Sequence, residues 1–496
     1  MESESNSGGA EIHSTQLAKS IDWKQGVIIA MGVPILILPS LYDISLPIWA
    51  FSIVIWGVSV IQGFLQNFVI GEMAAALEVP GIGGCAQEIF YNDRTKKYSL
   101  GRFLGAFTAW SYWFTWTPVI PIFTIMTGEY LRSFIDALSG INPTIMDLVL
   151  GIAIYSMIII IGRKGLSGGA RLGLILALVT LIPIVVISII PFFNGAFHYD
   201  TIVNDFLPDG IRHGSTKWTW SFHEIMVIFG VFAVAQWSAC AWESAATYGA
   251  EYKDPGKNLP KALIGCGLIC FAIYVLVSAS MFGSIGIDGV FDAGYATLKP
   301  LAVICFGAGV GTWIALFLLI AGMIMLIQTA FLGSSRTLYF MGEEGNLPKW
   351  FGKTNEYNVP LRAEFFQFLM GMCLIPLGSP GMILAASSFG FCTALGMAMV
   401  CFIKFRREER FAALRAKREY IAPKGWYYVA CGLCVYQFCF LIPGCAIFSI
   451  DSYGTSSVII GAVILFLYVP IWLLLQNAQW KNRDKSGEPV AVEEVS

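Results

Sequence analysis

The sequence predicts an all-α polytopic membrane protein with twelve transmembrane helices. Of its 496 residues, 56% are hydrophobic and only 13% are charged, and the mean hydropathy is +0.68. Soluble domains usually carry about twice that share of charged residues. Apolar runs recur along the chain, each close to the roughly 20 residues that a helix needs to cross a bilayer. The predicted spans are 25–44, 46–75, 103–131, 145–162, 170–192, 221–247, 261–284, 301–340, 364–378, 380–404, 426–450 and 456–475.

The polar ends of the chain predict two short tails. Residues 1–20 are polar and acidic, and they lack the basic start and apolar core of a cleavable signal peptide. Residues 476–496, which end in EPVAVEEVS, have the same polar character. We expect both tails to lie in the cytoplasm.

The distribution of Lys and Arg predicts how the chain is oriented. Basic residues near helix ends favour the cytoplasmic side. With the N-terminus inside, all but four of the 31 Lys and Arg residues fall on the inner side, the exceptions being Arg132, Arg212, Lys217 and Lys299. A wrong number of spans would scramble this asymmetry. It therefore supports twelve spans with both tails cytoplasmic, and we expect the membrane to be the plasma membrane.

The polar residue types argue against several classes of function. The net charge of −2 gives no sign of a nucleic-acid partner. Cys431 and Cys434 form a CxxC pair, but the pair lies inside an apolar span, where packing explains it better than redox chemistry. The four His residues do not join Cys or carboxylates at metal-ligand spacing. We expect no enzyme activity, no cofactor and no metal site.

Span 1 carries helix breakers at its centre, where residues 31–40 read MGVPILILPS. Gly32 tolerates unusual dihedrals, and Pro34 lacks a helical N–H but suits the first turn of a new helix. Irregular backbone at membrane depth survives only where it lines protein or a wet cavity. Taken alone, the stretch predicts either a kinked helix or an unwound hinge with a second half-helix starting near Pro34.

A second interruption, five spans later, favours the hinge. Span 6 contains FAVAQWSACAWESAATYGA, in which Gln236, Ser238 and Glu243 lie among small apolar residues. Discontinuous helices at matching positions of two halves are typical of transporters with inverted repeats. Spans 1–5 and 6–10 are then two repeats of a transport core over residues 21–404. A basic loop with spans 11 and 12 follows over residues 405–475.

Several blocks, taken in order, resemble the amino acid/polyamine/organocation (APC) superfamily of secondary transporters, in particular its amino acid permeases. They are MGVPILILP, GEMAAALEVPGIGGCAQEIF, LGRFLGAFTAWSYWF, WSACAWESAATYGAEYKDPGKNLPKA and SSRTLYFMGEEGNLPKWF. Each block alone is weak, but their order and spacing cover nearly the whole chain. The resemblance implies the fold of the leucine transporter, a 5+5 inverted repeat with broken helices 1 and 6, followed by two extra C-terminal helices.

The resemblance implies that the break in span 1 binds a substrate carboxylate through free N–H groups. The matching residues here are Gly32, Val33 and Pro34, followed by Ile35 and Leu36. The family typically has Gly-Ser/Ala-Gly at this triplet, so Pro34 is a departure that removes one donor. Losing one charge-assisted hydrogen bond weakens carboxylate binding by roughly 1.5–3 kcal/mol. An amino acid remains the leading substrate class, and an amine or another organic cation is the alternative.

In span 6 the resemblance places Trp237 over the substrate as a thin gate, and interhelical packing explains the residue equally well. The backbone carbonyls of Ser238, Ala239, Cys240 and Ala241 are expected to be free to accept a substrate ammonium. The family usually has Gly in the middle of this break. Ala241 therefore predicts a smaller unwinding.

Glu243 is the most informative ionisable residue. Carboxylates inside a membrane are costly and usually functional. We expect Glu243 to serve in proton coupling or gating, with a structural hydrogen bond to a neighbouring helix as the alternative. Glu72, Glu129 and Glu224 lie near predicted span ends, where we expect them to be solvated or to act as gate charges.

Comparison with the family also places Thr117 and Ile120 of span 3 at the central cavity. Some members carry a Lys in span 5, whereas this span has none and Thr180 stands near the matching position. Sodium therefore stays open as the coupling ion beside the proton. Thr180, Gln328 and Thr329 form a candidate ion site, and ordinary interhelical hydrogen bonds are the alternative.

Together these features predict secondary-active transport of amino acids by alternating access, as a symporter or an exchanger. The expected partners are a small-molecule substrate, protons or sodium, and the lipid bilayer. A carrier of amines, polyamines or other organic cations is the alternative within transport. A non-transporting sensor that keeps the transporter fold is the second alternative. The short tails carry no recognisable signalling module, which argues against it.

Overall fold

The computed structural model describes residues 21–30, 32–77, 79, 81–90, 96–163, 179, 181–247 and 251–486. All regular elements in these ranges are helical, and the β contact is an isolated bridge between Ile21 and Tyr252. The all-α prediction is confirmed.

The first half of the described chain alternates long helices with short turns of helix. Its elements are α1 (Trp23–Ala30), η1 (Val33–Leu36), α2 (Ile37–Ile48), η2 (Trp49–Phe51), α3 (Ser52–Leu77), α4 (Gly81–Ile89), α5 (Leu100–Trp116), α6 (Val119–Phe134), η3 (Asp136–Leu138), α7 (Pro143–Gly162), an apolar helix Leu181–Phe192 that ends in η4 (Ile190–Phe192), α9 (Tyr199–Asn204), α10 (Phe222–Ala239) and α11 (Glu243–Thr247).

The second half contains the longest helices. Its elements are α12 (Pro255–Ala293), η6 (Gly294–Ala296), α13 (Leu298–Phe306), α14 (Val310–Glu343), α15 (Leu361–Leu374), η7 (Ile375–Leu377), α16 (Pro380–Arg407), η8 (Glu409–Phe411), α17 (Ala412–Lys417), α18 (Trp426–Val435), the π-helical η9 (Tyr436–Leu441), α19 (Ile442–Tyr453), α20 (Thr455–Phe466) and α21 (Tyr468–Ser486).

Within the described residues, eight helical segments are long and apolar enough to cross a membrane. This is fewer than the twelve predicted spans, for identifiable reasons. Segment Trp23–Leu77 takes in two predicted spans at once. Predicted span 103–131 is divided at Pro118 into α5 and α6, and α15 has only 14 residues. Much of predicted span 170–192 falls outside the described residues. The twelve-span topology therefore stays a prediction.

The outer surface of the helices is apolar, as a lipid environment requires. Large exposed apolar patches are rare on soluble monomers. Here one face of α7 exposes a row of aliphatic side chains, and α20 with α21 exposes another. The most exposed members are Ile145, Val149, Ile152, Ile160, Ile161, Ile459, Val463 and Leu474. The chain is an integral membrane protein.

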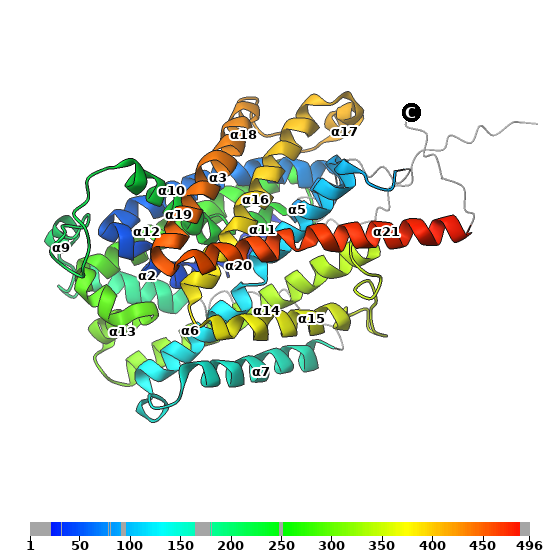
Figure 1. Ribbon diagram of the computed structural model, residues 1–496. Coiled ribbons are helices and arrows are strands. Elements are labelled where there is room, and N and C mark those ends of the chain that lie inside the picture. The colour runs from blue at the N-terminus through cyan, green and yellow to red at the C-terminus, as the bar shows by residue number, and fades with distance from the viewer. Residues whose placement is uncertain are drawn as a thin grey trace, which may run out of the picture.

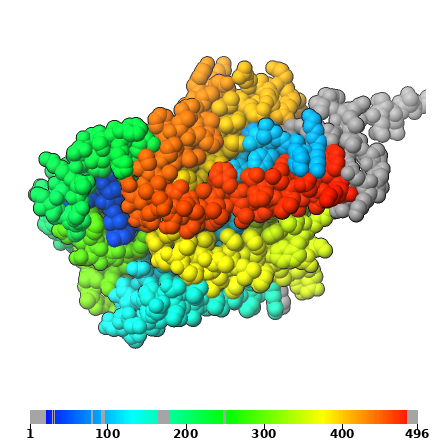
Figure 2. All heavy atoms as spheres, viewed as in Figure 1, coloured from blue at the N-terminus to red at the C-terminus, as the bar shows by residue number. Residues whose placement is uncertain are grey.

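Most helices run along one common direction, from left to right in Figure 1. Helices α7, α15 and α14 lie side by side along one edge, and α9 and α13 lie at one end of the bundle. Helix α17 and the end of α21 lie at the opposite end. Figure 2 shows that α20 and α21 cross the face of the bundle as one continuous ridge. Helix α16 packs in the interior against α5, α18, α20 and α4.

A buried ion pair fastens the segment that follows α16 to the end of α3. The side chain of Glu72 is fully buried, so the expectation that it is solvated is wrong. Its Oε1 accepts from Arg406 Nε at 2.9 Å, and its Oε2 accepts from Arg406 Nη2 and, at 2.7 Å, from the N–H of Ala422. Arg418 Nε lies 3.2 Å from Oε1. One carboxylate therefore compensates the positive charges of two guanidinium groups.

Glu72→Gln is expected to destabilise the protein by about 3–5 kcal/mol, because removing one partner leaves a buried charge uncompensated. The control is Glu408→Gln, since the Lys404–Glu408 pair is partly exposed and such pairs contribute about 0–1 kcal/mol. The melting temperatures of both purified variants in detergent provide the measurement. Equal melting temperatures for the two variants would contradict this account of Glu72.

Candidate functional site

The helix of span 1 is interrupted where the sequence predicts. Helix α1 ends at Ala30, residues Val33–Leu36 form the 3-10 turn η1 with Pro34 in its first positions, and α2 begins at Ile37. The second half-helix therefore starts three residues later than expected. Gly32 has ordinary helical dihedrals, φ −75° and ψ −19°, and a Cβ there would meet no atom within 4 Å. Pro34, rather than a special conformation of Gly32, thus accounts for the break.

Span 6 has a matching interruption. Helix α10 ends at Ala239, a turn covers residues 240–242, and α11 begins at Glu243. The turn is short, in keeping with the limited unwinding expected from Ala241. Two discontinuous helices are thus present among the described residues.

Side-chain hydroxyls join the two interruptions directly. Tyr274 of α12 places its hydroxyl 2.8 Å from the carbonyl of Ser238 and 3.3 Å from that of Val33. Ser238 Oγ donates to the carbonyl of Leu36 at 2.8 Å and lies 2.7 Å from Ser40 Oγ. All these groups are buried. The polar backbone that the breaks release is therefore bonded across the interface between spans 1 and 6.

Three carbonyls of the span 6 break already have donors in this conformation. Besides Ser238, the carbonyl of Ala239 accepts from Trp242 Nε1 at 3.0 Å, and that of Cys240 accepts from Asn67 Nδ2 at 3.4 Å. The expectation that these carbonyls are free is wrong in this state for Ser238, Ala239 and Cys240, and it stays a prediction for Ala241. A ligand ammonium that binds them competes with these side-chain donors.

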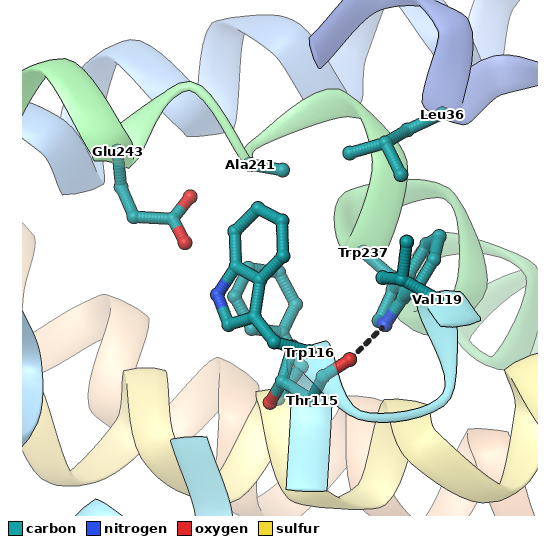
Figure 3. Close-up of a pocket in the computed structure, with 8 residues that line it drawn as sticks. Leu36, Thr115, Trp116, Val119, Trp237, Ala241 and Glu243 are labelled. Carbon is teal, nitrogen blue, oxygen red and sulfur yellow. Dashed lines mark hydrogen bonds between the residues drawn. The ribbon is translucent and has the colours of Figure 1, made fainter. Parts of the chain in front are cut away.

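A small cavity lies beside the two breaks. It is lined by Leu36, Thr115, Trp116, Val119, Trp237, Ala241, Glu243 and Phe391 and has a volume of about 10 Å³. Figure 3 shows Ala241 and Glu243 on one side of it, facing Trp116 of α5. Such a volume holds about one water molecule, whereas small-molecule pockets usually measure about 300–1,000 Å³. The site is therefore closed in this structure.

Trp237 lies in the wall of this cavity. Its Nε1 donates to the carbonyl of Thr115 at 3.2 Å, drawn as the dashed line in Figure 3. The acceptor lies just before the interruption at Thr117 and Pro118 that separates α5 from α6. The indole thus ties the break in span 6 to a third irregular point in the bundle.

Glu243 is fully buried and faces the cavity. Its Oε1 accepts from the hydroxyl of Tyr112 at 3.1 Å, and its Oε2 has no hydrogen-bond partner among the described residues. A buried carboxylate with an oxygen left unpaired is costly. Such a free-energy cost is expected for a carboxylate that binds and releases a proton or a ligand during function.

Thr117 and Ile120, which were also predicted to be at the site, do not line this cavity. Thr117 Oγ1 donates to Gln367 of α15 at 3.3 Å, and Ile120 lies against Gly371 of α15, so both face away from the cavity. Thr115 and Trp116 at the end of α5 and Val119 at the start of α6 line the cavity instead. Sequence spacing missed this because it assumed a continuous helix.

The candidate ion site receives no support from the geometry. Thr329 is exposed on α14 and its Oγ1 donates to its own helix, to the carbonyl of Met325 at 3.1 Å. Gln328 is partly exposed on the same helix. Thr180 lies outside the described residues. The intrahelical bond of Thr329 agrees with the alternative of ordinary hydrogen bonding.

Tyr274 and Asn67, which bond the broken backbone, were not predicted from the sequence. Tyr274 stands alone in the apolar stretch FAIYVLV, and Asn67 follows Gln66 in α3. Isolated polar residues in apolar spans were the available signal. Asn67 bonds Cys240 and Tyr274 bonds Val33, each more than 170 positions away along the chain, so pairing them requires the fold.

The architecture is that of a known class of helical membrane protein. A solved manganese transporter of Eremococcus coleocola, in complex with an aromatic bis-isothiourea substituted compound, superposes with a TM-score of 0.55. The alignment covers 96% of this chain and 97% of the other at 13% identity, which shows a shared fold.

The family is shown by sequence. The model of the amino acid permease family matches residues 21–478, and the chain belongs to this family of membrane transporters. A polyamine transporter of Oryza sativa subsp. japonica is 25% identical over 370 residues, covering 74% of this chain and 64% of the relative. The D-serine/D-alanine/glycine transporter of Escherichia coli (strain K12) is 22% identical over 406 residues, covering 78% and 79%. An arginine/ornithine antiporter of Lactococcus lactis subsp. cremoris is 27% identical over 290 residues, covering 54% and 56%.

Tyr274→Phe is expected to destabilise the closed state, because the carbonyls of Ser238 and Val33 lose their donor. An unsatisfied buried polar group costs about 1–3 kcal/mol. The matched control is Tyr155→Phe, since the hydroxyl of Tyr155 bonds Thr124, away from both breaks. Substrate uptake and melting temperature are measured for both variants. The account is wrong if uptake by Tyr274→Phe matches that of the control.

Proposed function

We propose that this chain moves amino acids across the membrane by alternating access, as an ion-coupled symporter or an exchanger. The observation that carries the proposal is the meeting of two interrupted helices at a small buried cavity. Irregular backbone in a membrane is tolerated where it lines a cavity or protein, and half-helices at the midplane are typical substrate sites. The membership in a transporter family supports the same conclusion.

The proposed topology has twelve spans in the fold of the leucine transporter. Residues 21–404 form the inverted-repeat core, and residues 405–475 form the basic loop with two further spans. The tails 1–20 and 476–496 lie in the cytoplasm, and the membrane is the plasma membrane. The asymmetry of Lys and Arg and the matching breaks in spans 1 and 6 support this arrangement.

The substrate binds between the breaks. Its carboxylate meets the N–H groups of η1, where Val33, Ile35 and Leu36 retain donors and Pro34 does not. Its ammonium meets the carbonyls around Ser238. These carbonyls now accept from side chains, so binding exchanges intramolecular hydrogen bonds for bonds to the substrate. The exchange limits the cost of opening the site, because no carbonyl is left unpaired.

Glu243 is the proposed coupling residue. It lies at the cavity, it is fully buried and one of its oxygens has no partner among the described residues. Proton binding at such a carboxylate neutralises a costly charge when the site closes. A proton is therefore favoured over sodium as the driving ion.

Uptake into proteoliposomes, under imposed proton and sodium gradients in separate experiments, tests this function. We expect a proton gradient to drive uptake of an amino acid such as L-alanine. Glu243→Gln, which preserves size and the hydrogen bond with Tyr112, is expected to abolish the response to the proton gradient. Binding without flux would contradict transport and indicate a sensor. A sodium-driven flux unchanged in Glu243→Gln would exclude the coupling role.

An amine or polyamine is the second candidate substrate, favoured by the missing donor at Pro34. A site with fewer N–H donors loses less binding free energy when its substrate has no carboxylate to accept their hydrogen bonds. Pro34→Gly restores the donor. If the native substrate is an amine, this variant is expected to bind amino acids more tightly than the wild type does. Its affinity for the decarboxylated amines is expected to be unchanged. Competition of both compound classes for uptake measures this. No shift for either class would mean that position 34 faces away from the substrate.

A further inference from the structure

A buried carboxylate surrounded by tyrosines lies in the middle of α2, beyond the cavity. Asp43 is only 2% exposed. Its Oδ1 accepts from the hydroxyl of Tyr295 in η6 at 2.9 Å and from that of Tyr453 at the end of α19 at 2.5 Å. Tyr42 packs edge-on against Tyr295, with ring centroids 5.1 Å apart. We call these four residues the Asp43 cluster.

The other oxygen of Asp43 is buried without a partner among the described residues. It faces the first turn of α16, where a Cβ on Gly381 would come within 2.1 Å of Oδ2. Gly381 is thus required to make room for the carboxylate. The N-terminus of a helix stabilises negative charge, and within the described part of the chain no Lys, Arg or His forms a salt bridge with Asp43. The cluster therefore presents a carboxylate that has no cation of its own.

The carboxylate of the Asp43 cluster lies on the same helical face as two residues that reach the central cavity and the break in span 6. Leu36, Ser40 and Asp43 follow one another at helical spacings of four and three residues, so they share one face of the chain here. Leu36 lines the cavity, and Ser40 contacts Ser238 at the break in span 6. At 1.5 Å per residue, Asp43 stands about 10 Å beyond Leu36. Its neighbour η6 precedes α13, which lies at the end of the bundle that the charge distribution assigns to the outside.

The chemistry of the cluster suits an organic ammonium. A carboxylate supplies charge-assisted hydrogen bonds, and aromatic rings attract ammonium groups through their faces. A hard metal cation prefers a shell of six or more oxygens, often with several carboxylates. Asp43 is the one carboxylate of this cluster, and the described residues contain no group of three His, Cys, Asp or Glu that could hold a metal.

We propose that the Asp43 cluster is an outer subsite that binds the ammonium group of a cationic substrate on its way to the central cavity. The inference rests on the proposed transport function. It specifies the substrate as an organic cation with an additional ammonium group, such as a diamine. Binding moves the Tyr295 and Tyr453 hydroxyls off Oδ1, and the ammonium donates to the carboxylate in their place.

The test compares uptake of putrescine, a dication, with uptake of L-alanine, which has no net charge. Asp43→Asn is expected to raise the KM for putrescine by roughly tenfold or more, since a charge-assisted hydrogen bond is lost, and to leave the KM for L-alanine within about twofold. The control is Asp288→Asn, which removes the same charge from an exposed residue near His213. The control is expected to leave both KM values unchanged.

A second variant distinguishes a cluster that binds substrate from one that only stabilises the structure. Tyr453→Phe keeps the ring and the carboxylate but removes one competing hydroxyl. The subsite predicts a KM for putrescine that is equal to or lower than that of the wild type. A purely structural cluster predicts impaired uptake of both compounds. This comparison decides the matter even if Asp43→Asn does not fold.

The outcomes distinguish the subsite from the proposed function. A wild-type protein that imports neither compound would overturn the transport function and the subsite with it. Import of L-alanine without putrescine would leave transport intact and overturn the subsite. A change in the sodium dependence of L-alanine uptake in Asp43→Asn would show that the cluster holds an inorganic cation, which also contradicts the proposal.

Discussion

The structure depends on how backbone groups are satisfied where two helices stop inside the membrane. Each unpaired N–H or C=O in hydrocarbon costs several kcal/mol, so a broken span is stable only if other elements supply partners. Tyr274 and Ser238 supply them at both breaks together. In the proposed transport cycle the half-helices separate before a substrate enters, and these bonds have to break at that step. In that proposed cycle, one small set of hydrogen bonds thus serves both stability and gating.

Much of the architecture follows from sequence because its determinants are local. Pro34 lacks an N–H, so the interruption of span 1 is visible in a few letters. The small polar stretch around Ser238 marks the second break in the same way. The number of membrane-crossing helices is less local. Pro118 divides span 3, and the run from Trp23 to Leu77 joins two predicted spans, so hydropathy and helix length count them differently.

The candidate site was harder to predict because it depends on rotation and on distant partners. Around the interruption at Thr117 and Pro118, Trp116 lines the cavity while Thr117 bonds Gln367 of α15. Glu243 and Trp237 could be selected from sequence, since a carboxylate and an indole stand out among small residues. Of the two alternatives for Glu72, solvation was wrong because its partner Arg406 lies more than 300 positions further along the chain, and a gate charge stays a prediction.

Access to the break in span 6 is the most direct test of alternating access. In Ala241→Cys, a new thiol lines the cavity, and a membrane-impermeant thiol reagent is applied from one side of the membrane at a time, with the wild type as background for the native cysteines. The account predicts modification of the new thiol from either side, and slower modification when a transported substrate is present. Modification from a single side only, whatever the substrate, would contradict a site that opens alternately to the two sides.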